Sequence, residues 1–410
     1  MNYLIEIHPW DLAEEGVEAA LAEVVGMGVK GVSLTATWPG LAVLRPRAAA
    51  QRMYFPQRGV VYFRPDDERW KESNLKPAPA ELVLIEDYLE SLPVRAQREG
   101  LVVEARVVLL PYEPHPAAAA AAKRSSATAA RPFSPEKLYV KNAFGDRLPG
   151  YLCPAYDEVR KYMMDLVCDI ARHAVTSIAL ESYGYPLFDF SGMPGADVLA
   201  SAPAAQFLMG VCFCEACTAR GEATNIEISP LAWRVRNFLE RVLSGEQTAV
   251  PPLTESPDGL GEIDELLPAY LRVRNDIVGT LVRDVRTALR KDVVLTAVSG
   301  SRWPAWQAWR EGSEIARLAG GSNVIRLQGN APDAAGLVLD ITRANERAAG
   351  RAKIAMRLTP GPPYASDYDS FAEKVSVAND LALDSVAFSG FGELAHAHLK
   401  WIPRIIAERP

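Results

Sequence analysis

Cysteine is scarce in this sequence, with five residues among 410, and three of the five stand close together. So few cysteines do not make a disulfide framework in a chain of this length, and we expect a reducing location, the cytoplasm. Residues 1–8 lack the basic start and the long apolar core of a secretory signal. No apolar run approaches the length of a membrane span, so no membrane partner is expected.

Runs of basic residues are also missing. The net charge is −7, from 44 Lys and Arg against 51 Asp and Glu, which argues against a nucleic-acid partner. Hydrophobic residues make up 49% of the chain, enough for a large core. Strand-like and helix-like segments alternate nearly to the end, and we therefore expect one domain over residues 1–410.

Short apolar runs that end in Gly, Pro or polar residues recur eight times, and a helix-like stretch follows each. The runs are residues 3–8, 29–37, 102–110, 177–181, 293–299, 323–328, 353–358 and 385–390. Eight strand-then-helix units predict an α/β fold, a (β/α)8 TIM barrel with long βα-loop insertions. In such a barrel the active site lies at the C-terminal ends of the strands.

Three of the expected loops are long. The insertion at 39–79 follows the second strand, and its segments 52–55 and 60–63 predict a hairpin. An Ala-rich piece that ends at Ala130 follows the third strand and is expected to form a mobile loop or lid. The insertion at 182–262 follows the fourth strand and carries the clustered cysteines.

Side chains alternate along a strand, which predicts the set that faces the barrel interior. This set is Glu6, His8, Ser33, Thr35, Thr37, Glu104, Arg106, Ala179, Glu181, Thr296, Arg326, Gln328, Arg357 and Ser389. Burying unpaired charges costs several kcal/mol per ion, so a pocket with water or a polar ligand is expected there. For Glu104 with Arg106, an internal salt bridge that only fills space is equally open.

Glu181 is the last residue of the fourth strand. A carboxylate at this position suits a nucleophile or a general acid or base. Hydrolysis of a glycosidic bond generally requires two carboxyl groups on opposite sides of the bond. The preferred second catalytic carboxylate is Glu393, with Glu6 next, and the loop residues Glu113 and Asp146 stay open.

Aromatic side chains gather in the loops expected around the barrel mouth. They are Trp38, Tyr54, Phe55, Tyr62, Phe63, Tyr183, Tyr185, Phe188, Trp303, Trp306 and Trp309. Flat apolar rings with polar neighbours suit a sugar, although packing of the loops explains about half of them as well. The residues expected to bind substrate are His8, Thr37, Trp38, Tyr112, Asp146, Tyr183, Tyr185, Trp303, Arg326, Gln328 and Arg357.

The segment CFCEAC places Cys212, Cys214 and Cys217 in a C-x-C-x-x-C array. Three thiolates this close can occupy three corners of a zinc tetrahedron. Cys153 is the best candidate for the fourth ligand, and His115 is the second. A closed shell of four ligands predicts a structural Zn²⁺ that fastens the long loop. No organic cofactor is expected.

Three segments resemble a group of glycoside-hydrolase-like barrel proteins: residues 152–162 (LCPAYDEVRKY), 177–181 (SIALE) and 212–217 (CFCEAC). In that group a similar helix precedes a fourth strand that ends in a catalytic-type acid, and a Cys-rich loop follows. The cysteine array also resembles the zinc cluster of the β-galactosidases of glycoside hydrolase family 42, where an upstream cysteine is the fourth ligand. The resemblance implies a carbohydrate-active enzyme with Glu181 as a catalytic carboxylate and Cys153 as the fourth ligand.

The chain departs from this pattern in three places. Many relatives have Asp at the position of Glu181. The clan of those β-galactosidases has Asn before its strand-four acid, where this chain has Leu180. That clan also has its nucleophile at the end of strand seven, whereas residues 356–360 (MRLTP) contain no acid. Neither the pair of carboxylates nor galactoside specificity therefore carries over.

The leading hypothesis is a cytoplasmic glycoside hydrolase that acts on a small glycoside or an oligosaccharide from the chain end. The first alternative is a metal-dependent sugar isomerase, epimerase or lyase on the same barrel, using Glu6, His8 or Glu104. The second is a carbohydrate-binding barrel without turnover, because a second catalytic carboxylate is not obvious. The expected partner is a carbohydrate, and assembly into a homo-oligomer stays open.

Overall fold

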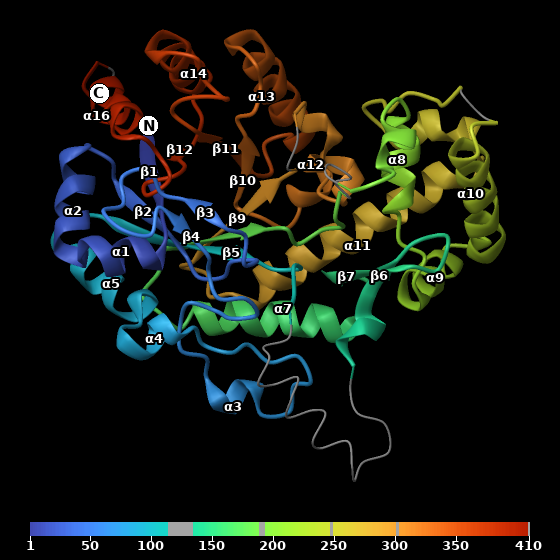
Figure 1. Ribbon diagram of the computed structural model, residues 1–410, viewed down its shortest axis with the longest axis horizontal. Helices are drawn as coiled ribbons and strands as arrows, with labels where there is room; N and C mark the ends of the chain where they lie inside the picture. The colour runs from blue at the N-terminus through green and yellow to red at the C-terminus, as the bar shows by residue number, and fades with distance from the viewer. Residues whose placement is uncertain (114–133, 188–192, 247–248, 301–302, 409–410) are drawn as a thin grey trace.

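The computed structural model describes residues 1–113, 134–187, 193–246, 249–300 and 303–408. Within them, eight parallel strands close into a barrel (Figure 1). Their order around the barrel is β1 (Asn2–Ile7), β12 (Ser385–Phe388), β11 (Lys353–Leu358), β10 (Val324–Gln328), β9 (Val294–Ser299), β8 (Ser177–Glu181), β5 (Val102–Val108) and β2 (Gly31–Thr35). The predicted (β/α)8 barrel is confirmed, and each strand overlaps its predicted run.

The strand register brings the polar inward side chains of neighbouring strands together. Glu104 of β5 lies level with Ser33 of β2 and Ser177 of β8. One inward step further along β5, Arg106 lies level with Ala179 of β8. The small side chains beside each long charged one leave space for it in the barrel interior.

Helices surround the barrel (Figure 1). They are α1 (Pro9–Glu15), α2 (Val17–Gly26), α3 (Asp67–Trp70), α4 (Glu81–Ile85), α5 (Tyr88–Arg98), α7 (Asp157–Ile170), α11 (Leu267–Ala288), α12 (Ile315–Leu318), α13 (Ala334–Ala348), α14 (Tyr368–Asp380), α15 (His396–Leu399) and α16 (Trp401–Glu408). The 3-10 turn η4 (Ala305–Glu311) precedes α12. Gly16 separates α1 from α2 because its φ of +83° lies in the left-handed region, which glycine adopts at low cost.

Apolar and polar residues divide between the two sides of the barrel sheet. Ile5, Leu180 and Leu327 are each at most 1% exposed and belong to the large apolar core, while their sequence neighbours Glu6 and Glu181 lie on the opposite, inner side. The apolar core therefore lies between the strands and the helices, and the barrel interior is left to charged groups.

The segment after β2 differs from expectation. Strand β3 (Val43–Leu44) pairs antiparallel with β4 (Met53–Tyr54). The expected pairing of residues 52–55 with residues 60–63 is wrong, because the second segment instead forms a bridge to Thr37 just beyond β2. Its side chains are buried in apolar clusters of the barrel, which holds it against the barrel.

Two further insertions follow β5 and β8. The first contains η1 (Pro135–Leu138) and the hairpin of β6 (Tyr139–Lys141) and β7 (Arg147–Leu152). The second contains η2 (Ala196–Leu199), α8 (Pro203–Met209), α9 (Glu215–Glu222), α10 (Ile228–Leu243) and η3 (Pro257–Glu262), and α8, α9 and α10 lie together beside the barrel in Figure 1. The Ala-rich piece that ends at Ala130, His115 and Phe188 lie outside the described residues.

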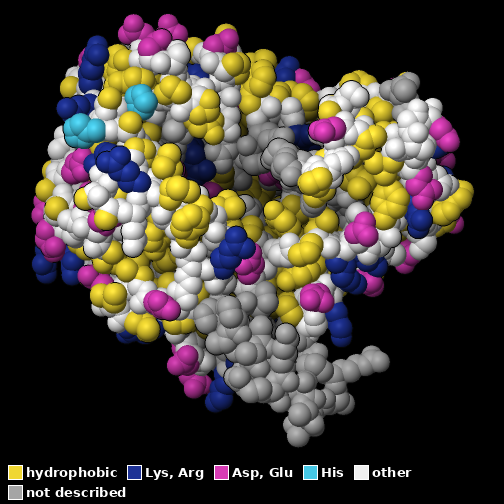
Figure 2. Space-filling view, in the orientation of Figure 1, with side chains coloured by type: hydrophobic (Ala, Val, Ile, Leu, Met, Phe, Trp, Pro, Cys, Tyr) yellow, Lys and Arg dark blue, Asp and Glu magenta, His cyan; other side chains and the backbone are white. Residues whose placement is uncertain are grey.

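No described helix combines the length and the apolar character that crossing a bilayer requires. On the face shown in Figure 2, acidic and basic side chains of the described residues are interspersed among apolar and uncharged ones. This face therefore carries no extended field of one sign.

Candidate active site

A buried ion pair spans the barrel interior. Arg326 donates from Nη1 to Glu104 Oε1 at 2.7 Å and from Nη2 to Oε2 at 2.9 Å. Ser33 donates to the same carboxylate at 2.7 Å. Burial raises the pKa of Glu104, but the charge and hydrogen bonds of Arg326 outweigh burial and hold this pKa below its ordinary value. Both side chains are at most 2% exposed, so Arg326, a predicted sugar-binding residue, is placed where it holds Glu104.

An internal salt bridge of Glu104 with Arg106 was one of two open alternatives. Both side chains are in buried ion pairs, but with other partners, since Arg326 pairs with Glu104 and Arg106 pairs with Glu6. Arg106 Nη1 donates to Glu6 Oε2 at 2.8 Å, and Arg357 Nε donates to Glu6 Oε1 at 2.6 Å. Glu6 is only 3% exposed, and both of its oxygens accept from a guanidinium group. Glu6 therefore positions two arginines in this arrangement.

Glu181 lies at the mouth, in contact with the free end of Arg357. Arg357 donates from Nη2 to Glu181 Oε1 and from Nη1 to Gln328 Oε1 at 3.3 Å. The Glu181 side chain keeps 14% exposure and that of Arg357 keeps 12%. Burial raises the pKa of Glu181, but the charges of Arg357, Arg106 and Arg326 outweigh burial and bring this pKa below its ordinary value. Glu181 is thus an ionised carboxylate that the mouth leaves partly open.

His8 and Glu393 form a second polar pair at the mouth. Arg106 Nη2 donates to Thr35 Oγ1 at 2.8 Å, which leaves the Thr35 hydroxyl hydrogen to His8 Nδ1 at 2.9 Å. This assigns the hydrogen of neutral His8 to Nε2, which lies 2.8 Å from Glu393 Oε1. The Glu393 side chain is 41% exposed. Burial raises the pKa of Glu393, but the hydrogen bond from His8 and the charges of Arg106 and Arg357 outweigh burial and lower this pKa.

One hydrogen-bonded network therefore joins the three predicted carboxylates. It runs from Glu181 through Arg357, Glu6, Arg106, Thr35 and His8 to Glu393. Its two ends, Glu181 and Glu393, are its most exposed acids. Between them, Glu6, Arg106, Thr35 and His8 are buried, and the Arg357 side chain is 12% exposed. The ionised carboxylates of Glu181 and Glu393 are thus both accessible to solvent, at the two ends of one hydrogen-bonded network.

Sequence reasoning missed Trp10 and Asp11, which fix His8. The Trp10 ring stacks on the His8 ring with centroids 4.2 Å apart. The His8 backbone N–H donates to Asp11 Oδ2 at 3.0 Å, part of a capping box at the start of α1. An acid three residues after a strand end, followed by a helix, is the signal that could have found Asp11.

Trp38 and Thr37 have different surroundings. The Trp38 ring meets the edge of His8 at 4.9 Å, and the Arg106 guanidinium lies 5.4 Å from the centre of the Trp38 ring. Trp38 therefore borders the mouth. Thr37 Oγ1 donates to Val108 O at 2.8 Å and accepts from Val108 N at 2.7 Å, so its hydroxyl fastens β5 to the loop after β2.

The predicted tyrosines after β8 turn inward. Tyr183 is 2% exposed and donates its hydroxyl to Val298 O at 2.9 Å. Tyr185 is equally buried, and its hydroxyl lies 3.4 Å from Cys217 Sγ. These two rings support the loop after Glu181. Tyr185 also lines a cleft between the loops after β2, β5 and β8, and Tyr183 is not among the described residues that line it.

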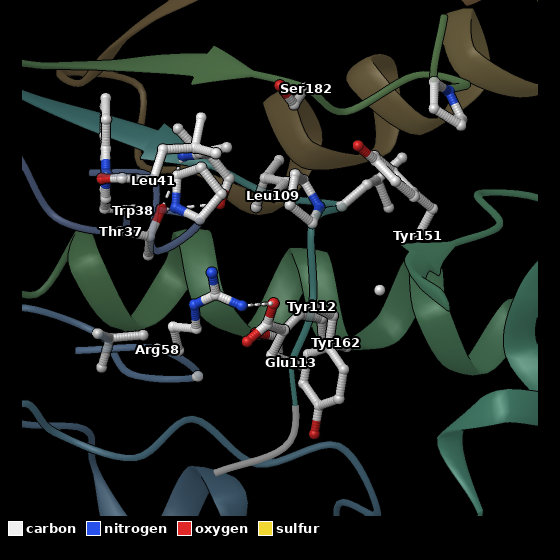
Figure 3. A pocket seen from close by; sticks show the side chains of 18 of the residues that line it. Thr37, Trp38, Leu41, Arg58, Leu109, Tyr112, Glu113, Tyr151, Tyr162 and Ser182 are labelled. Carbon is white, nitrogen blue, oxygen red and sulfur yellow. Dashed lines mark hydrogen bonds and ion pairs between the residues drawn. The ribbon is translucent and has the colours of Figure 1, made fainter. Parts of the chain in front are cut away.

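Asp146 and Tyr112 lie on segments away from the barrel axis. Asp146 accepts from Asn142 Nδ2 at 3.2 Å within the turn between β6 and β7. Tyr112 lines a cleft of about 500 Å³ between the loops after β2, β5 and β8 (Figure 3). Trp38 lines the same cleft, and Asp146 is not among the described residues that line it.

The four cysteines named from the sequence come together in the fold. Cys153 Sγ lies 3.4 Å from Cys217 Sγ, 3.6 Å from Cys214 Sγ and 3.7 Å from Cys212 Sγ, and all four residues are buried. Four sulfurs about 2.3 Å from a central zinc ion would lie about 3.8 Å apart, so this spacing fits a metal site. The spacing also exceeds the disulfide bond length of about 2.05 Å.

The grouping of metal-ligand side chains also bears on the isomerase alternative. Among the described residues, the four cysteines are the only group of three or more His, Cys, Asp or Glu side chains with ligand atoms close enough to share one ion. The carboxylate oxygens of Glu6 and Glu104 accept hydrogen bonds from arginines. The two ring nitrogens of His8 contact Thr35 and Glu393. The set Glu6, His8 and Glu104 does not gather around one point.

The chain matches no protein-family model and no curated protein sequence. Solved structures do resemble it, and three of them are as follows. A cyclic α-maltosyl-(1→6)-maltose hydrolase from Arthrobacter globiformis matches with TM-score 0.46 and 11% identity over 99% of this chain and 82% of that one. A chitinase from Bacteroides thetaiotaomicron matches with TM-score 0.42 and 9% identity over 100% of this chain and 97% of that one. A glycoside hydrolase family 18 N-acetylglucosaminidase from Paenibacillus barengoltzii matches with TM-score 0.42 and 12% identity over 98% of this chain and 99% of that one. Likenesses this distant leave activity to be argued from the site itself.

Asp340 on α13 supports the loop after β9, which carries Trp303. Its Oδ1 accepts the Ala305 N–H at 3.0 Å. Burial raises the pKa of Asp340 from 3.8 to about 6. The folded state holds the proton of Asp340 more tightly than the unfolded state. The stability that this proton contributes is therefore fully present below about pH 4 and is lost as the pH rises through about 6.

We therefore expect Asp340→Asn to raise the free energy of unfolding at pH 7, by up to about 3 kcal/mol, and to change it little at pH 4. Urea unfolding of both proteins at the two pH values measures this difference. Asp292→Asn, which alters an exposed acid, is the control. An equal gain at both pH values would contradict the assignment.

Proposed function

We propose that this protein is a glycoside hydrolase that acts on a small glycoside or on the end of an oligosaccharide, with Glu181 as a catalytic carboxylate. The observation that carries the proposal is Glu181 at the C-terminal end of β8. Its side chain is ionised and partly exposed, and Arg357 holds it through an ion pair. Active sites of (β/α)8 barrels lie at this end of the strands. An ionised carboxylate there suits the positive charge that develops at the anomeric carbon.

Glu181 takes the role of nucleophile or charge stabiliser in this proposal. Its lowered pKa keeps it ionised at neutral pH, as that role requires. Its oxygen approaches the anomeric carbon while the glycosidic C–O bond breaks. Arg357 holds the carboxylate in one direction, so little freedom is lost when the sugar binds.

The His8–Glu393 pair supplies the proton for the leaving oxygen. A proton taken up at Glu393 Oε2, the oxygen that His8 does not contact, passes to the leaving oxygen, and this transfer returns Glu393 to the ionised form whose Oε1 accepts from His8 Nε2. The exposed end of Glu393 reaches solvent, so water can restore the proton. Glu6 positions Arg106 and Arg357 and does not react.

A panel of nitrophenyl α- and β-glycosides tests this function. We expect at least one glycoside to release nitrophenol with saturable kinetics. Release from none of them, together with sugar binding by calorimetry, would leave the barrel as a carbohydrate-binding protein and reject the proposal.

We further propose that Cys153, Cys212, Cys214 and Cys217 hold a structural Zn²⁺. The buried sulfurs and their spacing support this, and four protein ligands leave no open position for water. Zinc would tie α9 to the segment before α7. Through the contact of Cys217 with Tyr185, it would also steady the loop that follows Glu181.

We expect one zinc per chain by elemental analysis and native mass spectrometry. Cys217→Ser should lose the metal and lower Tm by about 5–10 °C, because the metal stabilises only the folded state. Cys168→Ser, a change at a cysteine outside the cluster, should alter neither quantity. Full zinc occupancy in Cys217→Ser would count against the four-cysteine site.

A further inference from the structure

The cleft between the loops after β2, β5 and β8 is not used by the chemistry proposed above. Its volume is about 500 Å³, within the range typical of small-ligand sites. Glu181, Glu393 and His8 are not among the described residues that line it. The cleft is therefore a second binding space beside the reacting groups.

The cleft adjoins the barrel mouth. Trp38 lines the cleft and also contacts the His8 ring, and Ser182 lines the cleft directly after Glu181 in the chain. Ser182 has a φ of +49°, a conformation uncommon outside glycine, and its carbonyl accepts the Leu110 N–H at 2.9 Å. Trp38 and Ser182 thus lie where the cleft borders the surroundings of His8 and Glu181.

The cleft wall combines aromatic rings with a neutral polar rim. Tyr112 and Tyr151 line it, and Tyr151 is 38% exposed (Figure 3). Arg58 pairs with Glu113 at 3.4 Å on the rim, and Lys76 and Glu311 also line the cleft, so its two basic and two acidic residues offset each other. Rings beside polar groups without net charge suit a neutral sugar, whose C–H face is apolar and whose edge is hydroxyls.

This wall is formed before any ligand arrives. Tyr112 N donates to Gly150 O at 2.7 Å, and the Tyr112 ring packs edge-on against Tyr162, with centroids 5.7 Å apart. The Arg58 stem lies against Gly40, where a Cβ would come within 2.6 Å of Arg58 Cγ. A preformed site loses less free energy to ordering on binding.

We infer that this cleft binds the sugar units that follow the one held at Glu181, so that the preferred substrate is a neutral oligosaccharide, bound more tightly than a simple glycoside. The inference rests on the proposed function for the unit at Glu181. It adds a site for the remaining units, with Tyr151 as the ring most open to them.

Calorimetric titration tests the cleft in the Glu181→Gln background, where hydrolysis does not interfere. The probes are cellotriose, maltotriose and tri-N-acetylchitotriose, against glucose and N-acetylglucosamine. We expect one trisaccharide to bind at least about 10-fold more tightly than its monosaccharide. Adding Tyr151→Ala should remove most of that gain and leave the monosaccharide Kd within about two-fold. Trp233→Ala, at an exposed ring on α10, should change neither Kd.

The inference is overturned if no trisaccharide binds more tightly than its monosaccharide, or if Tyr151→Ala weakens both equally. Thermal melting of each variant checks that the fold is retained. Turnover of glycosides by the wild type is measured separately. Affinity that rises with chain length, without turnover, would reject the hydrolase function but support binding in the cleft. Turnover without any dependence of affinity on length would support the hydrolase function and reject binding in the cleft.

Discussion

Glu181→Gln should lower kcat on the order of 10³–10⁵-fold, with little change in folding stability. The amide keeps the shape of the carboxylate but cannot bond to the anomeric carbon or stabilise its positive charge. Arg357 keeps its ion pair with Glu6 in this variant, so no guanidinium group is left without a partner. Steady-state kinetics on the best glycoside and a thermal melt measure the two quantities.

Glu68→Gln is the matched control, because that side chain is 84% exposed on α3. It should leave kcat and Tm unchanged. Equal turnover by Glu181→Gln and the wild type would reject Glu181 as a catalytic carboxylate. A loss of activity that tracks a loss of folded protein would reduce Glu181 to a structural role.

The second large effect is expected on stability, from the ion pair of Glu104 with Arg326. Arg326→Met leaves a buried carboxylate whose ionised form has lost both of its guanidinium donors. We expect the free energy of unfolding to fall by about 3–5 kcal/mol, as when one partner of a buried pair is removed. Urea unfolding at pH 7 measures this loss.

The double variant Glu104→Gln/Arg326→Met separates pairing from packing. Removing both charges should restore a large part of the stability, because no unpaired ion stays buried. If the double variant loses as much as the sum of the single variants, the two side chains do not act as a pair. The structure would then be wrong about the barrel interior.

The alternation of apolar runs with helical stretches was sufficient to predict the barrel. Side-chain alternation on the strands also predicted which acids and arginines meet in the interior, since each inward position follows from a single strand. The pairing of those residues could not be predicted. Arg326 reaches Glu104 across the barrel, and that contact depends on strand order, register and side-chain length together.

The loops show the same limit. Tyr183 and Tyr185 appeared as sugar-binding rings because they follow Glu181 in the chain. The positive φ of Ser182 turns the chain at that point, and both rings are buried, but Tyr185 still lines the cleft. The cysteine array was predictable because spacing along the chain already limits how far its three thiols can separate. The cleft joins three separate loops, and no local pattern in the sequence predicts it.

A crystal structure with the hydrolysed monosaccharide bound tests the role of Glu181 most directly. We predict the anomeric carbon about 3–3.5 Å from a Glu181 carboxylate oxygen, with Glu393 on the opposite face of the sugar ring. A sugar bound elsewhere at saturating concentration, with Glu181 still facing Arg357 across an empty mouth, would contradict the account.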